Sequence, residues 1–318
     1  MRPLARDGED AAVIDLPAGY AARPLRPDDA AGVVAVMAAQ QLRDLGEVSI
    51  ELADIESDWS RPSFDLAAST LGVFADGGLV AYAEISGADR GDAAVHPEHE
   101  GRGLGTALAA WMRRRAAELG HSWIGMYVPA GSPGDLLLEH LGHEVRWTAW
   151  VLALSADAVV PRRDLPPGYT VREARPQEYE RCWQVKEDAF LEWSRREREP
   201  YADWRATTVE RAGFAPWGLR VVVDAEGAVV AMAHLILAPL AEGLEGHVTT
   251  LATRSDQRRR GLAQVLLADS FAAARDHGAG RCGLDTDSRT GALGLYEKVG
   301  MVVTSTWHHR AARLTAPA

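Results

Sequence analysis

The sequence is short of cysteine and of lysine, and the cysteine shortage excludes some classes of protein. The two cysteines, Cys182 and Cys282, match neither a C-x-x-C motif nor the spacing of a zinc site. A disulfide-rich scaffold is therefore excluded, and we expect two unpaired thiols, no metal and a cytoplasmic protein. Lys186 and Lys298 are the only lysines, so arginine carries almost all of the basic charge.

Basic charge is also scarce overall. Lysine and arginine total 34 residues against 45 aspartates and glutamates, which gives a formal net charge of −11 over 318 residues. An acidic chain is a poor candidate for non-specific binding to nucleic acid, and its field favours small cationic partners. We therefore expect no nucleic-acid partner.

Long hydrophobic runs are absent as well. The longest, residues 228–241, is interrupted by His234 and Pro239 and is too short to span a bilayer. Residues 1–16 contain arginines but lack the apolar segment of a signal peptide. We therefore expect no membrane association. Hydrophobic residues nevertheless make up 47% of the chain and charged residues 25%, which is typical of a globular protein with a buried core.

The chain contains an internal repeat. Four segments of the first half recur in the same order in the second half, displaced by 149 to 158 residues: 16–27 and 165–176, 75–77 and 225–227, 101–105 and 259–263, 138–142 and 296–300. Chance would not preserve both order and spacing. We predict two copies of one domain, residues 16–154 and 168–314, joined by a linker at 155–167.

Each copy is predicted to be a mixed α/β domain. In the second copy β-branched runs and helical periodicity predict strands at 169–173, 219–223, 228–237, 247–253 and 282–286, and helices at 262–277 and around 292–299. In the first copy the central helix is predicted to bury one stripe of side chains: Leu104, Leu108, Trp111, Met112 and Leu119.

A glycine-containing loop between a strand and a helix is a phosphate-binding arrangement, because free amides at a helix N-terminus favour an anion. Residues 251–263 resemble the R/Q-x-x-G-x-G/A signature of the GNAT N-acetyltransferase superfamily, and residues 291–301 resemble its A-x-x-L-Y-x-x-x-G-F/M motif. The resemblance covers both copies. It implies two tandem GNAT folds, each with a mixed central sheet that splays between its fourth and fifth strands and carries helices on both faces.

The resemblance also implies acetyl-CoA as the acyl donor. Its implied contacts in the second copy come from the strand end, the arginine loop and the start of the helix, with one more after the fifth strand: Leu251, Ala252, Thr253, Arg258, Arg259, Arg260, Gly261, Leu262, Ala263 and Ser288. A backbone amide at or next to Thr253 would bond the acetyl carbonyl. Ser288 stands where many relatives carry asparagine.

Three residues are candidates for the chemistry. By resemblance, Tyr296 would protonate the leaving sulfur, although a tyrosine on a helix can equally be a core residue. His247, six positions before Thr253, stands where relatives carry the residue that accepts the amine proton, and its ordinary pKa near 6.5 suits that task. Glu245 shares the strand face and is the rival base. Asp285 and Asp287 could bind a cationic substrate or cap the following loop.

The first copy departs from the pattern in three places. Glu100 replaces Arg258, Leu138 replaces Tyr296, and a shorter hairpin places Asp89, the counterpart of His247, in a turn. The loop itself is retained, which leaves a weaker second CoA site formed by Val95, Arg102, Gly103 and Gly105. We expect this copy to be structural, or to bind CoA without turnover.

The leading hypothesis is an N-acetyltransferase that acts in the second copy on the amine of a small molecule. A non-catalytic CoA-binding or regulatory module is the first alternative, and acetylation of a protein or peptide is the second. Tryptophans such as Trp193, Trp204 and Trp217 could line an amine site or belong to the core.

Overall fold

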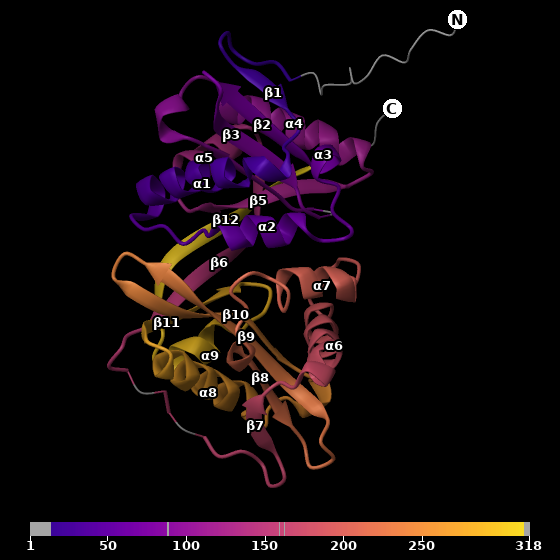
Figure 1. Ribbon diagram of the computed structural model, residues 1–318, viewed down its shortest axis with the longest axis vertical. Coiled ribbons are helices and arrows are strands. Elements are labelled where there is room, and N and C mark those ends of the chain that lie inside the picture. The colour runs from indigo at the N-terminus through magenta and orange to yellow at the C-terminus, as the bar shows by residue number, and fades with distance from the viewer. Residues whose placement is uncertain (1–13, 88, 159, 162, 315–318) are drawn as a thin grey trace, which may run out of the picture. The chain divides into compact units, whose positions relative to one another are not determined.

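The computed structural model describes residues 14–314 except residues 88, 159 and 162 (Figure 1). The described chain forms two compact units. Unit 1 comprises the chain up to Trp59, the segment Phe64–Arg146 and the chain from His308 onward, and unit 2 comprises Ser60–Ser63 and Trp147–Trp307. Each unit is mixed α/β, as the sequence predicts.

Unit 1 contains an antiparallel sheet in the order β1-β2-β3-β4. Its elements are β1 (Ala21–Arg23), α1 (Ala30–Leu45), α2 (Leu52–Trp59), α3 (Leu66–Ser69), β2 (Thr70–Ala75), β3 (Gly78–Ile85), β4 (Gly91–Val95), α4 (Leu104–Glu118), β5 (Trp123–Pro129) and α5 (Pro133–His140). A core around Val33 and Tyr82 lies between α1 and the sheet, and a second core around Leu108 lies under α4. The sheet therefore has helices on both faces.

Unit 2 contains a larger sheet in the order β7-β8-β9-β10-β11-β6-β12. Its elements are the main part of β6 (Glu144–Leu154), β7 (Thr170–Glu173), α6 (Tyr179–Phe190), α7 (Tyr201–Thr207), β8 (Leu219–Val223), β9 (Val229–Leu240), β10 (Gly243–Thr253), α8 (Leu262–Asp276), β11 (Ala279–Asp287), α9 (Leu293–Lys298) and the first half of β12 (Val302–Arg313). Helices α6 and α7 cover one face, whereas α8 and α9 cover the other.

The last strand of each repeat is divided between the units. Strand β6 leaves unit 1 after Arg146, and its remaining residues pair antiparallel with β11 in unit 2, from Ala149–Asp287 to Leu154–Cys282. Strand β12 begins in unit 2 and ends in unit 1, where it neighbours β5. The compact units are therefore not continuous stretches of the chain.

Equivalent positions of the two repeats make the same local contacts. The Tyr20 hydroxyl accepts a hydrogen bond from Arg102 at 3.0 Å, and the Tyr169 hydroxyl accepts one from Arg260 at 3.0 Å. Gly103 and Gly261 precede α4 and α8 with φ angles of 85° and 79°. The repeat is thus preserved down to single interactions at the predicted phosphate loops.

The predicted core of α4 is correct except at one end. Leu104, Leu108, Trp111 and Met112 are buried, whereas Leu119 is 43% exposed because the helix ends at Glu118 and Leu119 lies at its cap. Both cysteines are free and buried, and burial raises the pKa of Cys182 to about 12. Among the described residues, no helix has the length and apolar character needed to cross a membrane.

Candidate functional site

The sheet of unit 2 opens at the predicted place. Strands β10 and β11 pair in parallel from Leu244–Ala279 to Val248–Leu284. Beyond that point the end of β10 pairs with β9, and the end of β11 pairs with β6. A bulge marks the opening, where the Thr249 hydroxyl lies 2.8 Å from His234 Nδ1. Bulges often lie next to active sites, where they redirect side chains.

The residues predicted to contact the acetyl-CoA donor lie along this opening. Leu251, Ala252 and Thr253 form the end of β10. The hydroxyl oxygen of Thr253 is buried and has no hydrogen-bond partner within the described part of the chain. Leu262 and Ala263 begin α8, and the first amides of an α-helix lack intrahelical acceptors.

The three loop arginines have different surroundings. Arg258 forms a two-pronged ion pair with Glu192, with N–O distances of 2.6 and 2.9 Å, and its Nε donates to the Thr253 carbonyl at 3.3 Å. Arg260 donates to the Tyr169 hydroxyl. Arg259 makes no hydrogen bond or ion pair with any described residue and has a φ angle of 63°, in the left-handed region. The loop therefore keeps two arginines that are not neutralised by a carboxylate.

Tyr296 lies on α9, under the face of the sheet that also carries α8. Its side chain is 7% exposed and packs in the cluster that contains Val248 and Leu284, the last pair before the opening. Burial raises the pKa of Tyr296 to about 12. Its hydroxyl makes no hydrogen bond within the described residues, so it stays protonated with its proton free for another acceptor.

His247 lies between two carboxylates. Its Nδ1 is 2.8 Å from Glu245 Oε1, and its Nε2 is 3.2 Å from Asp285 Oδ2. Burial would lower the pKa of His247, but the hydrogen bonds to Asp285 and Glu245 raise it to about 10. Burial would likewise raise the pKa of Glu245, but His247 and the guanidinium of Arg281 hold it below its usual range.

This cluster faces away from α8. A side chain on Gly246 would clash with Ala274 of α8, so the neighbouring Glu245 and His247 point to the opposite face. Gly283 makes room for the cluster, because a Cβ there would come within 2.6 Å of the Glu245 carboxylate. Tyr296 and the His247 cluster therefore lie on opposite faces of the sheet, beside the same opening.

Two further predicted residues have structural partners. Asp287 accepts hydrogen bonds from the Arg289 backbone amide at 2.9 Å and from the Arg289 guanidinium at 2.6 Å. Asp287 therefore caps the following loop, which was the alternative to binding a cationic substrate. The Ser288 hydroxyl accepts from the Thr148 amide at 3.3 Å, and the Ser288 amide donates to the Thr148 carbonyl at 2.9 Å. Ser288 thus extends the pairing of β11 with β6.

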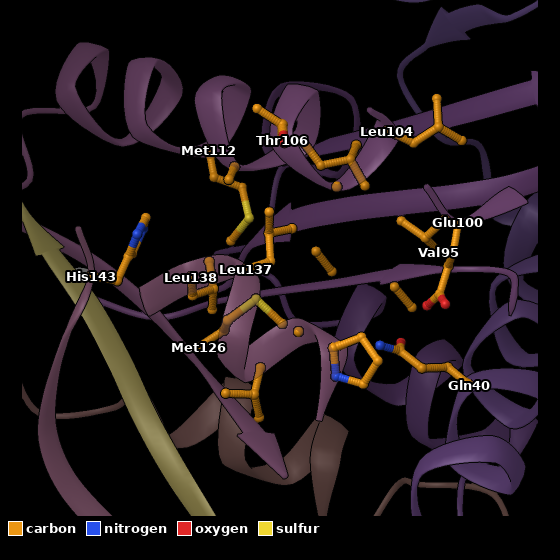
Figure 2. A pocket seen from close by; sticks show the side chains of 18 of the residues that line it. Gln40, Val95, Glu100, Leu104, Thr106, Met112, Met126, Leu137, Leu138 and His143 are labelled. Atoms are coloured by element: carbon orange, nitrogen blue, oxygen red, sulfur yellow. The ribbon is translucent and has the colours of Figure 1, made fainter. Parts of the chain in front are cut away.

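Unit 1 contains a cavity of about 440 Å³ at the corresponding place (Figure 2). Strands β4 and β5 are joined only by a bridge between Arg90 and Gly125 in the described part of this unit, so they stand apart. Val95, Gly103 and Gly105 of the predicted second site line the cavity. Arg102, the fourth predicted residue, instead donates to the Tyr20 hydroxyl and to the Glu98 carbonyl.

One end of the cavity is lined by His143, for which the sequence pattern gave no prediction. Figure 2 shows Glu100 and Val95 toward one end and His143 at the other, beyond Leu138. His143 is 6% exposed, and its Nδ1 has no hydrogen-bond partner among the described residues. Burial, together with the charge of Arg113, lowers the pKa of His143. The interior of this cavity therefore ends in a neutral imidazole.

The carboxylate that replaces Arg258 in unit 1 is itself neutralised. Glu100 pairs with Arg43 near the end of α1. Arg43 and Glu192 occupy equivalent positions of the repeat, as do Glu100 and Arg258. The two units therefore carry the same ion pair with its charges reversed. The sequence pattern indicates only the loop half of this exchange, because the other half lies 57 residues away in unit 1.

Comparisons with known proteins identify the family to which this chain is similar. The model of the Acetyltransferase (GNAT) family matches residues 173–301, and that of the FR47-like proteins matches residues 79–151. The mycothiol acetyltransferase of Salinispora arenicola is 30% identical over 244 residues, which cover 71% of this chain and 75% of the relative.

Solved structures share the whole architecture. A GCN5-related N-acetyltransferase from Sphaerobacter thermophilus is 27% identical with a TM-score of 0.71, and the match covers 94% of this chain and 97% of that one. A tandem GNAT protein from the clavulanic acid biosynthesis pathway, 17% identical, has a TM-score of 0.67 over 94% of this chain and 99% of that one. The second likeness concerns the fold alone.

Proposed function

Because the chain belongs to the GNAT acetyltransferase family, whose members use acyl-CoA donors, we propose that its C-terminal half transfers an acetyl group from acetyl-CoA to the amine of a small molecule. One observation carries this proposal. A protonated tyrosine and a histidine–carboxylate cluster lie on opposite faces of a sheet, beside the same gap between two parallel strands. A thioester entering from one face can meet an amine from the other in that gap.

The donor side of the gap suits the phosphates and the acetyl group. The first amides of α8 and the guanidinium groups of Arg259 and Arg260 would hold the diphosphate, since charge-assisted hydrogen bonds to phosphate are strong. A backbone amide at or next to Thr253 would polarise the acetyl carbonyl. The unpartnered hydroxyl of Thr253 agrees with a polar ligand here.

The chemistry requires a neutral amine and a proton for the leaving sulfur. Tyr296 would supply that proton, because burial keeps its hydroxyl protonated. Glu245 would orient His247 through Nδ1, leaving Nε2 toward the acceptor side as the base. The hydrogen bond of Nε2 to Asp285 must be given up before His247 can act in this way.

We propose a different role for the N-terminal half, namely binding of a CoA-type ligand without turnover. Its cavity is lined by loop glycines, and Arg43 beside Glu100 leaves the loop without net negative charge. Leu138 occupies the position of the catalytic tyrosine and cannot donate a proton. Such a site would hold a thioester but supply none of the acid chemistry.

The test of the main proposal is thiol release from acetyl-CoA across a panel of polyamines, aminoglycosides, amino acids, amino-acid amides and peptides. We expect turnover with small amines. Acetylation confined to peptides would favour the protein-acetylating alternative, and binding of acetyl-CoA without any acetylation would favour a binding module.

The variant Tyr296→Phe tests whether the Tyr296 hydroxyl takes part in the reaction. The variant keeps the ring and its packing but removes the proton donor, so kcat with saturating amine should fall about 10²- to 10⁴-fold. The dissociation constant of acetyl-CoA, measured by calorimetry, should stay within about threefold. Near wild-type kcat would reduce Tyr296 to a core residue and remove it from the mechanism.

A further inference from the structure

Two aspartates follow the opening of the sheet, and the structure distinguishes them. Asp287 is bound by the backbone and guanidinium of Arg289. The Asp285 side chain is 60% exposed, and its one hydrogen bond within the described chain is the contact of Oδ2 with His247. Asp285 comes directly after Leu284, the last residue of β11 that pairs with β10. It is therefore an accessible carboxylate at the point where the strands diverge.

The geometry also fixes the state of His247. Ionised carboxylates only accept hydrogen bonds, so a ring with a carboxylate at each nitrogen must carry a proton on both. Glu245 is buried and also bound by Arg281, whereas Asp285 has a free oxygen toward solvent. The imidazolium therefore acts as the counter-ion of Asp285 while no amine is present.

We infer that Asp285 is the docking carboxylate for the ammonium group of the acceptor, which makes the substrate class a cationic amine. The inference rests on the function proposed above. An ammonium that binds the free oxygen of Asp285 takes over as its counter-ion. Two cations at one carboxylate repel each other, so the Nε2 proton of His247 leaves to solvent. Glu245, His247 and Arg281 are the charged groups of β10 and β11 around the docking position.

The transfer then balances as follows. The free Nε2 of His247 accepts one proton from the ammonium, and the neutral nitrogen forms a bond to the acetyl carbon. The carbon–sulfur bond breaks, and the sulfur takes the proton of the Tyr296 hydroxyl. The nitrogen, which is cationic after the attack, releases a second proton to solvent, so the product is the neutral amide. Solvent returns a proton to the tyrosinate, and the next amine displaces the proton now on His247. Asp285 is thus a positioning residue that selects charged acceptors and frees the base only when one is bound.

The experiment compares Asp285→Asn with wild type on two amines from the panel at pH 9. One carries an α-amino group with a pKa of about 8 and is mostly neutral, and the other an aliphatic amine with a pKa of about 10.4 that is still charged. We expect KM for the charged amine to rise about 10- to 100-fold, since a charge-assisted bond is lost. KM for the neutral amine should change less than about threefold, as should kcat for both.

The matched control is Asp276→Asn, which removes the same charge from an exposed position at the end of α8. Asp285→Glu should recover part of the affinity for the charged amine. Equal losses for both amines, a loss in kcat alone, or kinetics like those of the control would overturn the docking role. A wild-type protein that acetylates no amine would instead refute the proposed function, so the two failures are distinguishable.

Discussion

At the scale of single residues, the most informative comparison is between Arg259 and Gly101, its counterpart in the repeat. Both adopt left-handed backbone, with φ angles of 63° and 70°. Glycine does so without penalty, whereas another L-residue pays roughly 1–2 kcal/mol. Strain of this kind persists at functional sites. This strain agrees with the phosphate contact that we propose for Arg259 in the C-terminal half.

Arg259→Gly should consequently improve stability and impair donor binding. We expect the free energy of unfolding in urea to rise by roughly 1 kcal/mol, reduced by the extra freedom of glycine in the unfolded chain. KM for acetyl-CoA should rise about tenfold, the effect of one lost phosphate contact.

Arg259→Ala is the control for strain. It removes the guanidinium but keeps a Cβ, so it should raise KM equally without the gain in stability. A glycine variant with wild-type KM would show that the side chain does not reach the donor, whatever its effect on unfolding.

The residues of the site were partly predictable. The resemblance to the GNAT motifs implied Tyr296 and His247 as candidates, and Glu245 was added because it shares the strand face of His247. The roles of Asp285 and Asp287 stayed open, since a strand places both on one face and only the three-dimensional position of Arg289 separates them. Likewise His143 gave no signal, because its isolation depends on the cavity around it.

At the scale of elements, each predicted phosphate loop forms one ion pair with the end of the first helix of its repeat. In unit 1 the cation is Arg43 on α1 and the anion is Glu100 on the loop. In unit 2 the anion is Glu192, just after α6, and the cation is Arg258 on the loop. The two copies share an ion pair at these positions, but the charge carried by the loop has opposite sign in the two units. We therefore interpret Arg258 mainly as an anchor of the loop.

A charge-reversal experiment separates the anchoring role from phosphate binding. Arg258→Glu should raise KM for acetyl-CoA at least tenfold, because Glu192 then faces a like charge. Adding Glu192→Arg recreates the pair of unit 1 and should bring KM back to within about threefold of wild type. The coupling between the substitutions is read from the double-mutant cycle. A double variant as poor as the single one would instead assign the Arg258 guanidinium to the phosphates.

Helices and strands were predictable to within a few residues where periodicity was strong. The expected helix at 262–277 corresponds to α8, and the expected strand at 247–253 to the second part of β10. The start of β11 at Ala279 was missed because Gly278 and Gly280 flank it, and glycine weakens strand signals.

At the scale of the whole molecule, the repeat predicted two α/β folds but not the division of their last strands. Strands β6 and β12 occupy equivalent places in the two repeats, and nothing in their sequences states which sheet each will join. That choice depends on which strand edge is free when the sheets assemble, a tertiary property.

The same comparison of repeats yields a prediction about the N-terminal half, namely that a tyrosine alone will not make it an enzyme. Asp89, the counterpart of His247, lies in the bend before β4 rather than on a strand, and its carboxylate binds Arg146 at 2.8 Å. The counterpart of His247 is therefore not carried by a described strand. In a chain silenced by His247→Ala and Tyr296→Phe, adding Leu138→Tyr should leave thiol release at background.

Leu138→Phe in the same silenced chain controls for ring size, and calorimetry with acetyl-CoA checks that the N-terminal cavity still binds its ligand. Binding without turnover in both variants agrees with a site that lacks the acceptor side. Thiol release that appears with tyrosine but not with phenylalanine would mean that only the acid was missing. The N-terminal half would then be a dormant catalyst rather than a binding module, because its missing strand segment would have been dispensable for chemistry.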